Sequence, residues 1–309
     1  KLCETENLVL TTDFLNANPI SVELGICDTS DLGRLLVASN ISDLCGTGAN
    51  PMAFLLGVTM AKDDKEEDLF NFFVGVKTEL DKLGIPLVGG DTKLGKSRAF
   101  IGTAIGNSKQ DRKLFLKNEA KPGDIIWVSG ELGAVGASVH YFANSFKDSK
   151  IESEAKKVIL NSDVPTHKSK LVSMAKIGNG GTDISDGLGA DLYDLLDSSN
   201  VGAVINSHKI PYGNLVASIA KFEKIEPWMF SLIIGGDFQF MVTTKAKHRD
   251  MMESFDFIEI GRITKNKEKY LIYNDKKLIL PDFGHRDGRK QNFRNEVKHI
   301  LNELTNLIY

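Results

Sequence analysis

Four short acidic segments are spread along this chain, and each one lies where an apolar run ends. They are Thr11-Thr12-Asp13, Ser42-Asp43, Gly89-Gly90-Asp91-Thr92 and Asp183-Ile184-Ser185-Asp186-Gly187. A protein that places several carboxylates at the ends of buried strands and helices usually uses them to hold a hard cation, because clustered negative charge is otherwise costly. The segments therefore predict a site for magnesium and phosphate.

Simple capping is the alternative explanation for two of these segments. Thr11-Thr12-Asp13 could cap a helix, because Asp and Thr accept hydrogen bonds from free backbone N–H groups. Asp183 and Asp186 flank the Ser185 hydroxyl where we expect a helix to start, and such a terminus also favours phosphate. Ser42-Asp43 instead lies inside an apolar periodic stretch, where a carboxylate needs a cation or several donors to offset its desolvation.

Two segments combine a pair of glycines with a carboxylate. Gly89-Gly90-Asp91 follows the apolar run 85–88, and Gly235-Gly236-Asp237 follows the apolar run 232–234, so we expect both at strand ends. Residues without side chains let a ligand approach the backbone closely at the point where the carboxylate is presented. A plain turn is the alternative for either one, and the repetition favours a ligand site.

The composition excludes several classes of partner. The chain has 309 residues, 42% of them hydrophobic, which is enough for two domains. Lys and Arg number 38 against 41 Asp and Glu, and the formal charge of −3 gives no reason to expect nucleic acid or an anionic membrane. No apolar stretch approaches the roughly 20 residues that span a bilayer, and no signal segment is evident. We expect a cytoplasmic protein that binds a small molecule.

The apolar periodicity predicts alternating strands and helices, as in an α/β protein. The turn Lys121-Pro122-Gly123-Asp124 suggests a domain boundary, so we expect domains at 1–122 and 123–309. Residues 147–157 are expected to form a solvated helix face, and residues 281–290 a loop. The expected strands are 8–12, 53–60, 86–88, 99–105, 125–129, 203–205, 238–244, 258–263 and 270–273, and the other expected helices are 33–44, 66–83, 134–144, 165–177, 187–196, 247–255 and 292–308.

The order of the motifs resembles the AIR synthase-related (PurM-like) superfamily and, within it, the thiamine-monophosphate kinase branch. The match spans most of the chain. Its motifs are Thr11-Thr12-Asp13, Asp31-Leu32-Gly33-Arg34, Asn40-Ile41-Ser42-Asp43-Leu44, Gly48-Ala49-Asn50-Pro51, Val88-Gly89-Gly90-Asp91-Thr92, Lys121-Pro122-Gly123-Asp124, Asp183-Ile184-Ser185-Asp186-Gly187-Leu188, Ala190-Asp191-Leu192 and Gly235-Gly236-Asp237.

The resemblance implies a two-domain α/β (α+β) PurM-like fold. In such proteins the amino-terminal domain pairs with that of a second subunit in a dimeric β-barrel, and the carboxy-terminal α/β domain closes over ATP. We therefore expect a homodimer with a site between the domains. The implied reaction is magnesium-dependent phosphotransfer from ATP to a small phosphorylated or alcohol metabolite, which needs metals to neutralise phosphate charge and an acceptor held in line.

The resemblance also assigns roles to individual residues. Asp183 and Asp186 are implied to be catalytic as well as metal-binding. The implied metal ligands are Asp13, Asp43, Asp91, Asp183 and Asp186, and the implied ATP-binding residues are Thr12, Gly89, Gly90, Thr92, Ser185, Gly235, Gly236 and Asp237. No Walker loop or protein-kinase motif is present in the sequence, which fits phosphate handling through magnesium.

Several positions depart from the kinase pattern. The Gly-Asp-Asp segment usual before the first strand has no counterpart before Leu8, and the histidine usual after Asp13 is missing from Phe14-Leu15-Asn16-Ala17-Asn18-Pro19-Ile20. Ala134 and Gln239 stand at two positions that are usually acidic. The alternatives are therefore a kinase for a different acceptor, a selenophosphate synthetase-like enzyme, or a nucleotide-binding relative without turnover.

Overall fold

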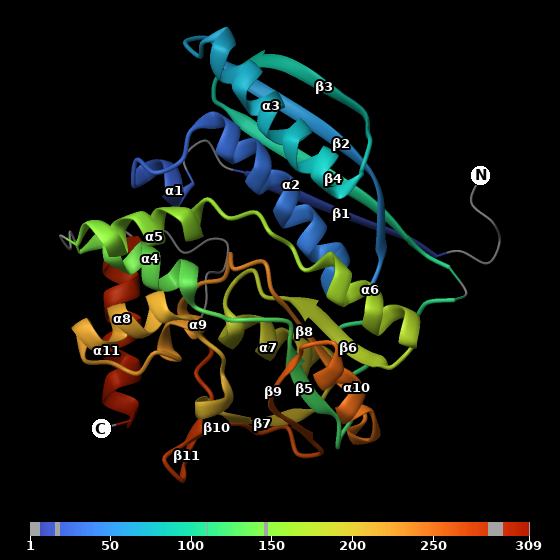
Figure 1. The fold of residues 1–309 in the computed structure, drawn as a ribbon, viewed down its shortest axis with the longest axis vertical. Coiled ribbons are helices and arrows are strands. Elements are labelled where there is room, and N and C mark those ends of the chain that lie inside the picture. Colours follow the sequence, from blue (N-terminus) through green and yellow to red (C-terminus); the bar gives the residue numbers. More distant parts are fainter. Residues whose placement is uncertain (1–6, 16–18, 110, 145–147, 284–292, 309) are drawn as a thin grey trace.

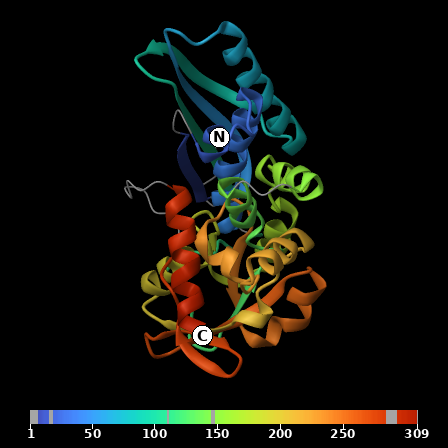
Figure 2. The ribbon, with the colours of Figure 1, turned by 90° about the vertical axis from the view of Figure 1, so that its left-hand side faces the viewer.

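The computed structural model describes residues 7–15, 19–109, 111–144, 148–283 and 293–308. It contains two β-sheets, one of four strands and one of seven, each covered by helices (Figure 1). Figure 2 shows the small sheet with helix α3 at one end of the molecule and the large sheet with helix α11 at the other. The two-domain architecture expected from the sequence is thus confirmed, while the boundary at residue 122 stays a prediction.

The small sheet has the strand order β1-β4-β2-β3. Its elements are β1 (Asn7–Leu15), α1 (Ile20–Glu23), α2 (Thr29–Gly46), β2 (Asn50–Ala61), α3 (Glu66–Leu83), β3 (Leu87–Gly95) and β4 (Ala99–Ser108). Strand β4 is antiparallel to both β1 and β2, whereas β3 is parallel to β2. Helices α2 and α3 cover one face of this sheet, and β1 and β3 are its edges. Within one chain the sheet is open, so a closed barrel is not present.

Alternation along β1 separates its residues between the two faces of the sheet. Thr11 and the Asp13 backbone form hydrogen bonds with α2, so odd-numbered residues of β1 face this helix. Leu10 and Phe14 point to the opposite face and are 59% and 54% exposed. This face therefore presents an apolar surface that no element of the same chain covers, as far as the structure describes it.

The large sheet has the strand order β11-β10-β7-β9-β5-β8-β6 and is mostly antiparallel. Among the described residues, no helix has the length and apolar character needed to cross a membrane. The elements of this part are β5 (Ile125–Val128), α4 (Ala134–Ala143), α5 (Ser149–Ile159), α6 (Thr166–Ala175), β6 (Gly178–Asp183), α7 (Leu188–Ser198), β7 (Gly202–Asn206), α8 (Asn214–Glu223), α9 (Met229–Ile233), β8 (Phe240–Thr244), α10 (Arg249–Ser254), β9 (Ile258–Thr264), β10 (Lys269–Tyr273), β11 (Lys276–Ile279) and α11 (Phe293–Ile308).

Helix α2 lies between the two sheets and packs against both (Figure 1). Its residues Leu36 and Ile41 belong to one apolar core that includes Phe100 of the small sheet and Phe240 of the large sheet. At the end of the helix, Gly46 meets strand β6 so closely that a Cβ atom there would lie 2.2 Å from the Asp183 backbone nitrogen. The absence of a side chain therefore lets the carboxyl ends of α2 and β6 meet.

Three expectations about local structure were wrong. Residues 89–92 do not form a turn but lie inside β3, paired with β2. Residues 232–234 do not form a strand, because Met229–Ile233 is the short helix α9, and a brief apolar run fits either structure. Strand β6 was not expected, because Gly178, Gly180 and Gly181 lack the branched side chains typical of strands.

The remaining differences are small. The expected helix at 66–83 is confirmed without change, and most other elements differ by a few residues at their ends. Helices α1, α8 and α9 and strand β11 were not expected. The expected loop at 281–290 lies largely outside the described residues, as does the start of the charged segment 147–157.

Candidate active site

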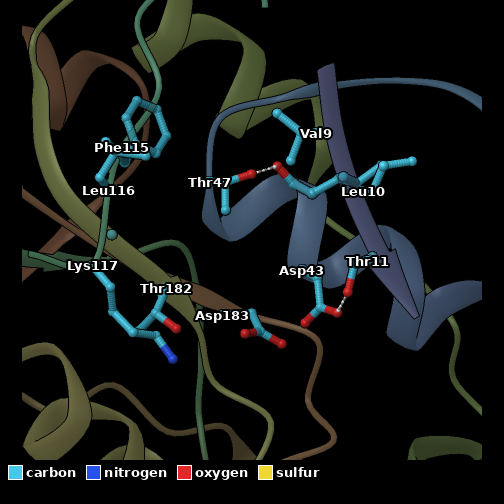
Figure 3. Close-up of a pocket in the computed structure, with 12 residues that line it drawn as sticks. Val9, Leu10, Thr11, Asp43, Thr47, Phe115, Leu116, Lys117, Thr182 and Asp183 are labelled. Atoms are coloured by element: carbon cyan, nitrogen blue, oxygen red, sulfur yellow. Dashed lines mark hydrogen bonds between the residues drawn. The ribbon is translucent and has the colours of Figure 1, made fainter. Parts of the chain in front are cut away.

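A cleft of about 330 Å³ opens where the two sheets meet (Figure 3). Its walls come from β1, the last turns of α2, the segment 115–117 and the end of β6. Asp43 reaches into it from α2 and Asp183 from β6, although the two residues are 140 positions apart in sequence. Three of the four acidic segments are thus brought together by the fold, because Thr11 of the first segment also lines the cleft.

Hydroxyl groups of two elements fix these carboxylates. The Thr11 Oγ1–H of β1 donates a hydrogen bond to Asp43 Oδ2, and the Ser42 Oγ–H of α2 donates one to Asp183 Oδ2 over 3.3 Å. Asp13 is held nearby, because its backbone N–H donates to Asn40 Oδ1 over 3.2 Å. The carboxylates of Asp43 and Asp183 are therefore each oriented by a neutral hydroxyl donor. These donors leave the excess negative charge of the cleft in place.

Burial and mutual repulsion shift the pKa values of both carboxyl groups upward. The pKa of Asp43 is raised to about 8, first by desolvation and then by the nearby charges of Asp183 and Asp13. Asp183 is only 8% exposed, and burial followed by the charge of Asp191 also raises its pKa. Such raised pKa values in a cleft are typical of carboxylates at functional sites, where a bound cation can offset their charge.

Two further charged groups, Asp191 and Lys117, were not among the expected site residues. Asp191 lies in the first turn of α7 and is buried, and its pKa is raised to about 7 by desolvation and then by the charge of Asp186. Lys117 lines the cleft and its positive charge lowers the pKa values of Asp183 and Asp191 (Figure 3). Asp191 appeared in the motif Ala190-Asp191-Leu192, whereas Lys117 carries no sequence signal of its own.

Ser185 and Asp186 follow directly after β6, on the loop 183–187 that enters α7. Ser185 is exposed, and Asp186 is half-buried. The second glycine pair lies against this loop, since a Cβ atom on Gly235 would lie 2.2 Å from the Ser185 carbonyl oxygen. The absence of a side chain at Gly235 therefore lets the two segments pack closely, and its assignment to ATP binding stays a prediction.

Asp237 has a clear structural partner. Its Oδ2 accepts a hydrogen bond from the Gly133 N–H over 2.7 Å, and its Oδ1 accepts one from the Val135 N–H over 2.9 Å. Both oxygens thus cap the start of α4, while burial raises the pKa of the carboxyl group to about 6. The structure explains Asp237 by helix capping, and its assignment to ATP binding stays a prediction.

The structure separates Thr12 and Asp91 from the cleft of their own chain. Thr12 lies on the far face of the small sheet, where its hydroxyl bonds that of Thr103 over 2.9 Å, so Thr11 takes the place expected for Thr12. Asp91 lies on the edge strand β3, and its side chain is 68% exposed and paired with Lys93 over 3.0 Å. Gly89, Gly90 and Thr92 share this strand, which β4 and β2 separate from β1. Asp91 therefore does not line the cleft that holds Asp43 and Asp183, and its assignment as a metal ligand stays a prediction.

The residues present fit magnesium by donor type. Asp43 and Asp183 offer hard oxygen atoms, and Mg²⁺ is usually held in proteins by one or two carboxylates together with water and substrate phosphates. In the described part of the chain, no group of three or more His, Cys, Asp or Glu side chains could hold a metal by itself. Protein ligands alone are thus few, which suits an ion that arrives with a phosphate.

The raised pKa of Asp43 predicts how the metal-free protein responds to pH. The folded state keeps this proton up to a pKa of about 8, while the ordinary value is 3.8, so folding stability is lost as pH rises through about 8. In buffer with a chelator, the melting temperature should fall between about pH 6 and pH 8.5, by roughly 2 °C for each 1 kcal/mol lost.

Asn at position 43 carries no charge, so Asp43→Asn should flatten this dependence in differential scanning fluorimetry. Asp81→Asn is the control, because Asp81 is an exposed carboxylate that pairs with Lys77 on α3. Equal pH slopes for the wild type and Asp43→Asn would contradict the electrostatic analysis of the cleft.

The chain is similar to known proteins in both sequence and fold. The family models for the AIR synthase related protein match the N-terminal domain at residues 1–107 and the C-terminal domain at residues 121–274. A thiamine-monophosphate kinase of Pyrococcus horikoshii is 30% identical over 82% of this chain and 78% of its own length. Another from Buchnera aphidicola subsp. Acyrthosiphon pisum is 31% identical over 89% of this chain and 83% of its own length.

The fold is similar to that of solved structures. A structure described as AaThiL complexed with AMPPCP and TMP superposes with a TM-score of 0.79, covering 93% of this chain and 89% of that chain at 23% identity. At this identity the likeness concerns the fold alone. The sequence matches, which extend over four-fifths of the chain, decide the family. The chain belongs to the AIR synthase-related (PurM-like) superfamily and, within it, to the group of the thiamine-monophosphate kinases.

Proposed function

We propose that this protein is an ATP-dependent phosphotransferase that phosphorylates thiamine monophosphate with magnesium as cofactor. The observation that carries the proposal is the similarity of about four-fifths of the chain to thiamine-monophosphate kinases at 30% and 31% identity. The cleft supports it, because the half-buried Asp43 and the buried Asp183, both with raised pKa values, share it with a lysine.

The residues of the cleft would have separate roles in phosphotransfer. Asp43 and Asp183 would hold magnesium, which supplies positive charge to the phosphate oxygens when bound. Lys117 enters from the opposite wall and offers a mobile point charge to a phosphate oxygen (Figure 3). Asp186 follows on the loop at the start of α7, where the helix amino terminus favours an anion.

The neutral residues at two usually acidic positions have partners of their own. Gln239 Oε1 accepts a hydrogen bond from the Ser129 Oγ–H over 2.7 Å, and Gln239 Nε2 donates to the Asp237 carbonyl over 3.1 Å. Ala134 is the first residue of α4, whose start Asp237 caps. These positions are integrated into the fold, and only a turnover measurement separates an enzyme from a nucleotide-binding relative.

The proposal is tested by incubating the purified protein with ATP, MgCl₂ and thiamine monophosphate. Formation of ADP and thiamine diphosphate in equal amounts is expected, measured by chromatography. Thiamine, other phosphorylated alcohols and selenide serve as alternative acceptors. Turnover with one of these instead would move the protein to another branch, and ATP binding without any turnover would favour the non-catalytic alternative.

Lys117→Ala should weaken binding of the phosphate-bearing substrates. A hydrogen bond to a charged group contributes about 1.5 kcal/mol or more, so KM for ATP or thiamine monophosphate should rise about 10-fold. Lys117→Arg should retain most of the affinity, because it keeps the charge. Lys121→Ala is the control, since Lys121 lies four residues further along but does not line the cleft. Equal KM values for Lys117→Ala and Lys121→Ala would remove Lys117 from the site.

We further propose that the exposed face of the small sheet pairs with the same face of a second copy. Leu10 and Phe14 on β1 and Ile101 on β4 form an apolar surface on this face. The two edge strands, β1 and β3, flank it and offer unpaired backbone groups. Asp91 lies on a strand of this sheet, so any metal it binds would lie at the junction of two chains and not in the cleft of its own chain.

Phe14→Asp should convert the dimer into a monomer, because it places a charge in the proposed apolar interface. Light scattering coupled to size-exclusion chromatography should give about twice the mass of 34.0 kDa for the wild type and about 34.0 kDa for the variant. Phe70→Asp is the matched control, since Phe70 is 67% exposed but lies on α3, on the other side of the sheet. A monomeric wild type would refute the dimer.

A further inference from the structure

The loop 183–187 carries three predicted site residues, Asp183, Ser185 and Asp186, between β6 and α7. It turns sharply before the helix, and Gly187 adopts a φ of 107°, which favours glycine. Phosphoryl transfer depends mainly on the placement of charged groups, so a small displacement of this loop would be costly. The groups that hold the loop therefore bear directly on the reaction.

The first half of the loop is held by the segment that precedes β8. The Ile184 N–H donates a hydrogen bond to the Gln239 carbonyl over 2.8 Å, and Gly235 packs against the Ser185 backbone. These contacts restrain the first half of the loop. They do not involve the backbone N–H of Asp186, which lies in the second half.

The second half of the loop is held by Asp191. Its Oδ2 accepts a hydrogen bond from the Asp186 N–H over 3.0 Å, so the side chain reaches back from the first turn of α7 over the start of the helix. The helix does not depend on this side chain for its own bonding, because the Asp191 N–H donates to the Gly187 carbonyl in the usual way over 3.1 Å. The carboxylate thus serves the loop more than the helix.

A carboxylate at position 191 has a cost in folding free energy. It is only 4% exposed, and Asp183, Asp186 and Asp194 all add negative charge around it. Lys117, which lines the cleft, supplies an opposing charge. A buried carboxylate among like charges lowers folding stability unless its hydrogen bonds compensate, and such residues concentrate at functional sites.

We propose that Asp191 is a positioning residue of the phosphotransfer site, whose side chain fixes the loop 183–187 through the backbone N–H of Asp186. This inference rests on the proposed function as far as the reaction is concerned, whereas the hydrogen bond itself can be tested without turnover. The role requires an acceptor oxygen at position 191, and not a negative charge.

Two substitutions separate these requirements. Asp191→Asn keeps an oxygen that can accept from the Asp186 N–H but removes the charge, whereas Asp191→Ala removes both. Loss of a residue that orients a metal ligand typically costs about 10-fold to 100-fold in activity or metal affinity. We therefore expect kcat of Asp191→Ala to fall at least 10-fold, and Asp191→Asn to stay within about 3-fold of the wild type.

Hydrogen exchange of the peptide that contains Asp186 gives a readout independent of activity. The peptide should exchange faster in Asp191→Ala and at the wild-type rate in Asp191→Asn. Asp194→Ala is the matched control, because Asp194 is an exposed carboxylate three residues further along the same helix. It should change neither exchange nor kcat. If Asp191→Ala does not fold, as judged by circular dichroism, Asp191→Ser takes its place, because its hydroxyl is too short to reach the Asp186 N–H.

Rescue by Asn in both measurements supports the proposal. Wild-type exchange in Asp191→Ala overturns it, and so does a loss of activity in Asp191→Asn equal to that in Asp191→Ala, since charge would then be the requirement. If the wild type shows no turnover with any acceptor, the proposed function fails while hydrogen exchange and the affinity for ATP with MgCl₂ still decide the role of Asp191.

Discussion

The close approach of helix α2 to the end of strand β6 is the contact on which the candidate site depends. Gly46 permits it, because any side chain there would collide with the Asp183 backbone. The approach brings Asp43 and Asp183 into one partly desolvated cleft, where both pKa values rise. Repulsion between these carboxylates lowers folding stability. A bound divalent ion would remove this repulsion, so the same charges increase the affinity for a cation.

The architecture around this contact explains how the repulsion is sustained. Helix α2 belongs to an apolar core that runs from the small sheet to the large one, with Phe100 on one side and Phe240 on the other. Displacing the helix would break packing on both sides. The base of the cleft is thus supported by packing from both sheets, and the loop 183–187 is held separately by the Gly235 segment and by Asp191.

The two faces of the small sheet differ in their surroundings. Thr11 and Thr12 are neighbours in the chain, yet Thr11 bonds Asp43 in the cleft while Thr12 bonds Thr103 on the far face. The far face combines an apolar surface with open edge strands, which suits a second copy of the chain. Asp91 lies on an edge strand of this sheet, away from the cleft of its own chain, and its part in metal binding stays a prediction.

The sequence by itself determined the family, the two-domain α/β class and the acidic motifs, because motif order and apolar periodicity are local properties that survive without coordinates. It also selected Asp43 and Asp183, which line one cleft in the structure, while their metal-binding role stays a prediction. Only the tertiary structure decided which neighbours join them, since strand register selects Thr11 over Thr12 and helix capping accounts for Asp237. Asp191 stood in a recognised motif without a role of its own, and its burial and charge contacts became visible only in the structure. Lys117 carries no local pattern, because its importance lies in charge contacts with segments distant in sequence.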